Sequence, residues 1–186
     1  MKLLTAATMY NDRSNYRRYP KVPIERRVGA FAIDFLAVWF VSSFFAANLF
    51  LQWLVFLLIW LAMRVLLAEK NRGQTLGRWA LDTKVIDPRF NRIPDLITLS
   101  KREIIVGFAG ALAVCGLQIN VRNGLSMLFL LTPLLIDCAL AFTDEELNQA
   151  FHDRIAQTLM IQTERGFSLD LRLKKILVQI KRRMQK

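Results

Sequence analysis

The chain has 186 residues, and 26 lysines and arginines against 15 acidic residues give it a formal net charge of +11. Its apolar fraction is 54%, and residues 28–68 carry only two charges, those of Asp34 and Arg64. So long a weakly charged stretch excludes a soluble globular protein and a disordered basic tail. A basic chain usually meets nucleic acid or an anionic membrane surface, and the apolar runs favour the membrane over nucleic acid.

The first two predicted segments are an arm and a helical hairpin. Residues 1–26 are polar and basic, and Pro20 and Pro23 disfavour a helix there. We therefore expect an extended cytoplasmic arm that enters the membrane near Ile24. A spanning helix needs about 20 apolar residues. Residues 27–68 fit two such helices, with the turn of this first hairpin near residues 47–52.

A polar loop and a second hairpin follow. Residues 69–102 are polar and contain Pro88 and Pro94, which indicates a cytoplasmic loop. Residues 103–142 are apolar and predict helices at about 104–117 and 124–142, separated by the turn-forming residues 118–124. The first of these two helices is short for a span. It either starts earlier, near Leu96, or lies tilted or shallow in the membrane.

The cytoplasmic tail, residues 143–186, has two distinct parts. Residues 156–163 and residues 82–86 of the loop are both rich in β-forming residues, which makes the two stretches candidates for a short β-ribbon. Residues 168–186 place apolar side chains at helical spacing among lysines and arginines. This pattern predicts a basic amphipathic helix that lies on an anionic lipid leaflet.

The distribution of basic residues predicts the topology. The arm, counted here to Arg27, carries 7 lysines and arginines, the loop 8 and the tail 9, whereas the two hairpin turns carry none and one, Arg122. By the positive-inside rule, the arm, loop and tail lie in the cytoplasm. The predicted fold class is an all-α, multi-pass integral membrane protein with four transmembrane helices in two hairpins and both termini in the cytoplasm.

Three ionisable residues in different predicted spans lie at a similar depth. From a rise of about 1.5 Å per residue, Asp34, Asp137 and Arg64 lie roughly 9, 7–8 and 6 Å inside the cytoplasmic boundary. One interpretation is a structural salt-bridge cluster, because pairing offsets the cost of inserting charge. Another is a proton or cation site, and a third leaves one aspartate simply at the interface. Arg27, two helical turns before Asp34, is placed to cap the cluster or to bind lipid phosphate.

The sequence contains few residues in the patterns typical of catalytic, phosphate-binding or metal-binding sites. The glycine-containing stretch of residues 71–78 lacks the Gly-Lys-Ser/Thr ending of a P-loop and is better interpreted as a turn followed by a short helix. The single histidine, His152, has no cysteine or second histidine to complete a metal site. Cys115 and Cys138 lie within apolar runs and are interpreted as packing residues. We therefore expect no catalytic, cofactor-binding or metal-binding residues and no enzyme activity.

Three motifs together resemble the RDD family of small membrane proteins. The first motif is Arg27 followed seven residues later by Asp34. The second is the Gly-Gln-Thr-Leu-Gly-Arg stretch that starts at Gly73, followed by Val-Ile-Asp at residues 85–87, and the third starts with His152 and Asp153. In the third motif, Gln157 stands where glycine is usual. The matching positions are Arg27, Asp34, Gly73, Gln74, Thr75, Gly77, His152, Asp153 and Thr158.

The resemblance implies a multi-span membrane protein with cytoplasmic polar elements. It also implies that the arginine and two aspartates of the family name are Arg27, Asp34 and Asp153. Cation/proton exchange is suggested for some members of the family. Asp137 is not part of the family pattern.

Two functions are compatible with these features. The first is a non-enzymatic accessory, scaffold or assembly factor that acts through its basic cytoplasmic face on a larger membrane protein complex. The alternative is a cation/proton transporter that uses the cluster of Asp34, Arg64, Asp137 and Arg27, as a homo-oligomer because four helices make a thin pathway. The expected partners are a bilayer with anionic headgroups and either that complex or further copies of the chain, without nucleic acid.

The topology predicts where the ends of the chain react. Cysteines introduced singly at residues 2 and 186 should both be labelled by a membrane-impermeant thiol reagent only from the cytoplasmic side. Labelling of the two positions from opposite sides would contradict the four-span arrangement.

Overall fold

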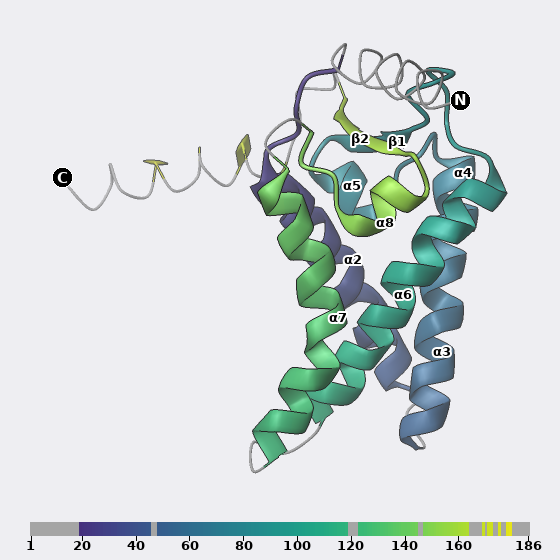
Figure 1. The fold of residues 1–186 in the computed structure, drawn as a ribbon, viewed down its shortest axis with the longest axis vertical. Helices are drawn as coiled ribbons and strands as arrows, with labels where there is room; N and C mark the ends of the chain where they lie inside the picture. The colour runs from purple at the N-terminus through teal and green to yellow at the C-terminus, as the bar shows by residue number, and fades with distance from the viewer. Residues whose placement is uncertain are drawn as a thin grey trace, which may run out of the picture.

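Helices dominate the part of the chain that the computed structural model describes, namely residues 19–45, 48–118, 123–144, 147–163 and six positions between 169 and 179. Four helical segments form a bundle, and a small cap closes one end of it (Figure 1). The bundle comprises α2 (Ile24–Ser43), α3 (Leu49–Leu61) with its extensions η1 (Ala62–Leu67) and α4 (Ala68–Lys70), α6 (Leu96–Gln118) and α7 (Gly124–Thr143). The cap comprises α5 (Leu76–Ala80), β1 (Thr83–Ile86), α8 (Phe151–Ile155) and β2 (Leu159–Gln162).

Two of the bundle helices are long and apolar enough to cross a membrane, those over Leu49–Lys70 and Gly124–Thr143. Only a minority of the residues of these helices are buried, whereas the core helix of a soluble protein is mostly buried. Helices α2 and α6 run beside them (Figure 1) and carry charges near the cap: Glu25, Arg26, Arg27 and Asp34 on α2, and Lys101, Arg102 and Glu103 on α6.

The apolar half of the bundle is held together by aromatic side chains that pack on small residues. Phe56 and Trp60 of α3 are fully buried with Val38, Val106 and Val114. Trp60 lies directly on Gly107 of α6, where an added Cβ would come within 2.6 Å of the indole. The small residues of α6 therefore allow α3 to approach closely.

The cap is built on a two-stranded antiparallel ribbon in which Val85 of β1 pairs with Met160 of β2. Val22 packs against both side chains, so the segment that precedes α2 also belongs to the cap core. Gly73, in the turn that precedes α5, has a φ of +81°, and a Cβ there would meet the carbonyl oxygen of Val85 at 2.5 Å. Only glycine satisfies both the backbone conformation and this contact.

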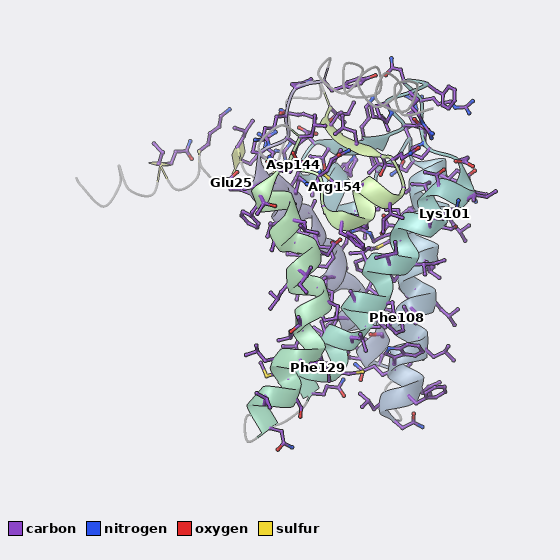
Figure 2. The ribbon with its side chains drawn as sticks, in the orientation of Figure 1. Glu25, Lys101, Phe108, Phe129, Asp144 and Arg154 are labelled. Atoms are coloured by element: carbon purple, nitrogen blue, oxygen red, sulfur yellow. The ribbon has the colours of Figure 1, made fainter. Side chains whose placement is uncertain are left out.

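Charged and apolar side chains separate along the long axis. The labelled charged residues Glu25, Lys101, Asp144 and Arg154 lie toward the cap, whereas Phe108 and Phe129 lie along the bundle away from it (Figure 2). Both helical hairpins, α2 to α3 and α6 to α7, turn at the end opposite the cap (Figure 1).

Most predicted elements are present, with some shifts. The β-ribbon between the loop and the tail is confirmed, so the described fold is mostly helical with a small sheet rather than all-α. Helix α6 starts at Leu96, the earlier of the predicted starts, and α3 starts at Leu49, so Gln52 is helical rather than in the turn. The arm up to residue 18, the turn containing Arg122 and most of the predicted tail helix of residues 168–186 lie outside the described residues.

The backbones of cap and bundle approach closely at Gly77, and this approach predicts a stability difference between two glycine variants. A Cβ at Gly77 would lie 2.0 Å from the carbonyl oxygen of Ala30, whereas a Cβ at Gly124 would meet nothing within 4 Å. Gly77→Ala should therefore lower the free energy of unfolding by about 1–3 kcal/mol, and Gly124→Ala should change it by less than about 0.5 kcal/mol. The unfolding midpoints of the two variants in detergent test this, and equal midpoints would contradict the packing.

Candidate functional site

Charged side chains gather, fully buried, where the cap meets the bundle. We call this group the polar core. Among the described residues it contains four arginines, four carboxylates, one histidine and one threonine: Arg27, Arg64, Arg78, Arg102, Asp34, Glu103, Asp137, Asp153, His152 and Thr75.

Asp34, on the buried face of α2, connects the bundle to the cap. Its Oδ2 accepts hydrogen bonds from Arg64 Nη1 at 2.8 Å and from the hydroxyl of Thr75 at 2.6 Å. Its Oδ1 accepts the backbone N–H of Gly77 at 2.7 Å. Thr75 also caps α5, because its Oγ1 accepts the N–H of Arg78 at 3.3 Å. One carboxylate therefore holds the α3 extension and the start of α5 together.

Glu103 is the second centre and lies on α6. Arg64 donates to its two oxygens, from Nε at 2.6 Å and from Nη2 at 3.3 Å. Arg78 Nη2 of the cap donates to Oε1 at 2.7 Å. The guanidinium carbon of Arg64 lies 4.6 Å from the ring centroid of Trp60, so the aromatic core of the bundle supports this arginine from below.

Asp153 is the third centre and lies on α8. Arg102 Nη2 approaches its Oδ1 at 3.0 Å, and Arg27 of α2 pairs with Oδ2. The hydroxyl of Thr158 donates to Oδ1 at 3.4 Å, and the N–H of Ala150 donates to Oδ2 at 3.4 Å. Asp153 therefore fixes α8 and the start of β2 to α2 and α6.

Asp137 of α7 pairs with His152 rather than with an arginine. Its Oδ2 lies 2.7 Å from His152 Nδ1, and its Oδ1 accepts the backbone N–H of His152 at 3.0 Å. His152 Nε2 lies 3.3 Å from Arg102 Nη2. Because that arginine can only donate, Nε2 is assigned as the acceptor and Nδ1 as the protonated nitrogen of a neutral ring.

The charges of the polar core balance, since four guanidinium groups face four carboxylates. Burying an ion is costly unless an opposite charge and hydrogen bonds compensate it. Each of Asp34, Glu103 and Asp153 has at least three donors within 3.5 Å from more than one element. These carboxylates are thus engaged by arginines rather than free to coordinate a cation.

The pKa values of the cap members follow from this environment. Burial alone would raise the pKa of Asp153, but the charges of Arg102 and Arg27 outweigh it and hold that pKa well below its usual range. Burial, and then the like charges of Arg64 and Arg102, lowers the pKa of Arg78 to about 9. The Arg78 guanidinium therefore lies in a region of excess positive potential.

The structure brings together only part of the predicted cluster. Asp34 and Arg64 form an ion pair. Asp137 does not join them, because α7 directs it to His152. Arg27 pairs with Asp153. It does not pair with Asp34, although Arg27 and Asp34 both lie on the buried face of α2.

Sequence reasoning missed Glu103, Arg102 and Arg78. The first two were assigned to the boundary between the loop and a short third helix. The signal that would have found them is the alternative start at Leu96, because a helix from that residue carries both into the bundle at the depth of Arg64.

The remaining motif positions shape the cap. Gln74 Nε2 donates to the carbonyl of Thr83 at 2.9 Å and so fixes the turn that precedes α5 to β1. Gln157 adopts φ of +52°, a left-handed conformation that glycine adopts without strain. This explains why glycine is usual at that position in the third motif.

The exposed apolar helices and the buried polar junction define a small membrane protein with a polar cap. The model of the RDD family matches residues 21–157. The chain belongs to the RDD family, whose members are small membrane proteins. The match includes every motif position named above except Thr158, because it ends one residue before it. No curated protein and no solved structure matches the chain.

The polar core predicts very different costs for removing two arginines. Arg64→Leu leaves Asp34 and Glu103 buried with fewer donors, and it should lower the free energy of unfolding by about 3–5 kcal/mol. Arg154, whose side chain is 47% exposed and lies 3.5 Å from Asp144, is the matched control. Arg154→Leu should cost less than about 1 kcal/mol.

Unfolding midpoints and elution profiles in detergent provide the measurement. If Arg64→Leu unfolded at the same midpoint as wild type, the buried ion pairs of Arg64 would not stabilise the junction between cap and bundle.

Proposed function

We propose that this protein is a non-enzymatic accessory or assembly factor, an integral membrane scaffold that presents its cap to a larger membrane protein complex. The observation that carries the proposal is the engagement of Asp34. Its carboxylate accepts three hydrogen bonds, two of them from the cap, so the most deeply placed acid of the family motif serves to hold the cap in place.

The proposal includes a four-span topology with the cap in the cytoplasm. Two features support it. The C-terminal ends of α2 and α6 and the N-terminal ends of α3 and α7 lie at the end opposite the cap (Figure 1). The arm, loop and tail carry 24 of the 26 lysines and arginines, and charge of this sign favours the cytoplasmic side.

The cap offers a surface of suitable chemistry for a protein partner. Phe90 is 61% exposed in the loop after β1. The guanidinium carbons of Arg89 and Arg92 lie 5.6 Å and 4.7 Å from its ring centroid. Aromatic and arginine side chains together are enriched at the centres of protein interfaces.

The test is co-migration with a complex from the native membrane after mild solubilisation. Wild type should run on a native gel with one large species at fixed stoichiometry. Phe90→Asp should shift the protein to its own mass without changing its unfolding midpoint, because the side chain is exposed. Phe129→Ala, which alters an even more exposed ring on α7 away from the cap, is the control and should still co-migrate. Migration of wild type alone would contradict the scaffold role.

One observation favours cation/proton exchange as a second candidate. Asp137 and His152 form a titratable pair that lines a cavity between α2 and α7. Intramembrane acids and histidines are the usual carriers in proton pathways. For this function, wild type in vesicles with a pH-sensitive dye should move protons when a cation gradient is imposed, and Asp137→Asn should abolish the movement while retaining the fold. Absence of cation-dependent proton movement by wild type would exclude this candidate.

A further inference from the structure

The arginines of the polar core have more donors than the carboxylates accept. Five of their nitrogens are buried and make no hydrogen bond among the described residues: Arg27 Nη1, Arg78 Nε, Arg78 Nη1, Arg102 Nε and Arg102 Nη1. Arg102 Nε lies 3.5 Å from Glu103 Oε1, as an ion-pair contact without hydrogen-bond geometry. Each of the three side chains is less than a tenth exposed. Buried donors without partners are costly, so several at one place indicate that an acceptor is missing.

The same three arginines line one cavity of about 60 Å³, together with Arg64, Asp137 and His152. This volume holds a few water molecules or a single small anionic group. Asp137 does not oppose an anion strongly, because His152 donates to it from both its backbone N–H and its ring. Among the polar groups of the lining, donors and positive charge therefore predominate, whereas most of the lining surface is apolar.

The cavity has an apolar rim on the lateral surface of the bundle. Val28 of α2 and Phe142 of α7 line it and are 44% and 61% exposed. Ala141 lines it from α7 but is itself buried. A basic interior behind an apolar rim at the end of two apolar helices suits an amphiphile whose headgroup points inward.

We propose that this cavity binds a phosphate group, held by Arg27, Arg78 and Arg102, either as the headgroup phosphate of a phospholipid or as free inorganic phosphate. Guanidinium groups are the preferred partners of phosphate, because their N–H groups bind its oxygens in parallel pairs. The pKa of Arg78, which burial and neighbouring arginines lower to about 9, is in keeping with a site that lacks an anion. The inference goes beyond the scaffold role and does not depend on it.

The experiment uses the full chain, delipidated in detergent and phosphate-free buffer. Three probes are added separately: phosphatidylglycerol, a galactosyl diacylglycerol with the same acyl chains but no phosphate, and inorganic phosphate. Native mass spectrometry measures bound mass, and the unfolding midpoint measures stabilisation. A phosphate-bearing probe at about 100 times its Kd should raise the midpoint by roughly 5 °C or more, whereas the galactolipid should not.

A filling variant locates the site without removing any charge. Ala141→Trp should fill the cavity and weaken binding of the phosphate-bearing probe at least about tenfold. Ala139→Trp places the same ring at an exposed position two residues away and should bind like wild type.

Each outcome decides the inference. Selective binding of phosphatidylglycerol assigns a lipid headgroup, and binding of inorganic phosphate alone assigns the free ion, and both support the site. Two results would overturn it. In the first, wild type binds neither phosphate-bearing probe in preference to the galactolipid, and water is then the missing acceptor. In the second, Ala141→Trp binds the phosphate-bearing probe as tightly as wild type. The comparison among probes on wild type stands even if Ala141→Trp fails to fold.

Discussion

The structure depends on the pairing of four buried arginines with three buried carboxylates, those of Asp34, Glu103 and Asp153, where a cap meets an apolar bundle. Separating the two parts would break the pairs that cross the junction, Arg78 with Glu103 and Arg27 and Arg102 with Asp153, and would leave buried charges with fewer partners. The cap has only short helices and a two-stranded ribbon, and such a ribbon is marginal by itself. The ion pairs therefore give the cap its fixed position, and the cap in turn shields the ions from lipid.

Geometry at two places makes the pairing work. Gly77 lets α5 approach α2 so closely that its backbone N–H reaches Asp34. Trp60 packs on Gly107 and supports the guanidinium of Arg64 with its ring. Glycines that seem to serve only turns and helix packing thus determine where the charges meet. The family motifs contain Gly77 for this physical reason.

The helices and the ribbon could be predicted because hydropathy and β-propensity are local properties of the chain. The pairing within the polar core could not, because helix rise gives the depth of an ionisable residue but not the direction in which it points. Asp34 and Arg64 share both depth and direction and meet. Asp137 shares only the depth, and α7 directs it to His152, which follows it by 15 residues. Glu103 escaped detection because it lies beside charged residues that seemed to belong to a loop.

The excess of donors follows from the chemistry of the side chains that were selected. A guanidinium offers five N–H donors in a plane, whereas a carboxylate can accept only about four, so equal numbers of the two leave N–H groups over. Lysine offers only three donors, so lysines in place of the arginines would balance the same charge and leave fewer N–H groups without an acceptor. Arg27, Arg78 and Arg102 instead carry surplus donors, and all three line one cavity with an apolar rim. The junction that fixes the cap is therefore also the part of the described molecule best prepared to hold an anionic oxygen cluster.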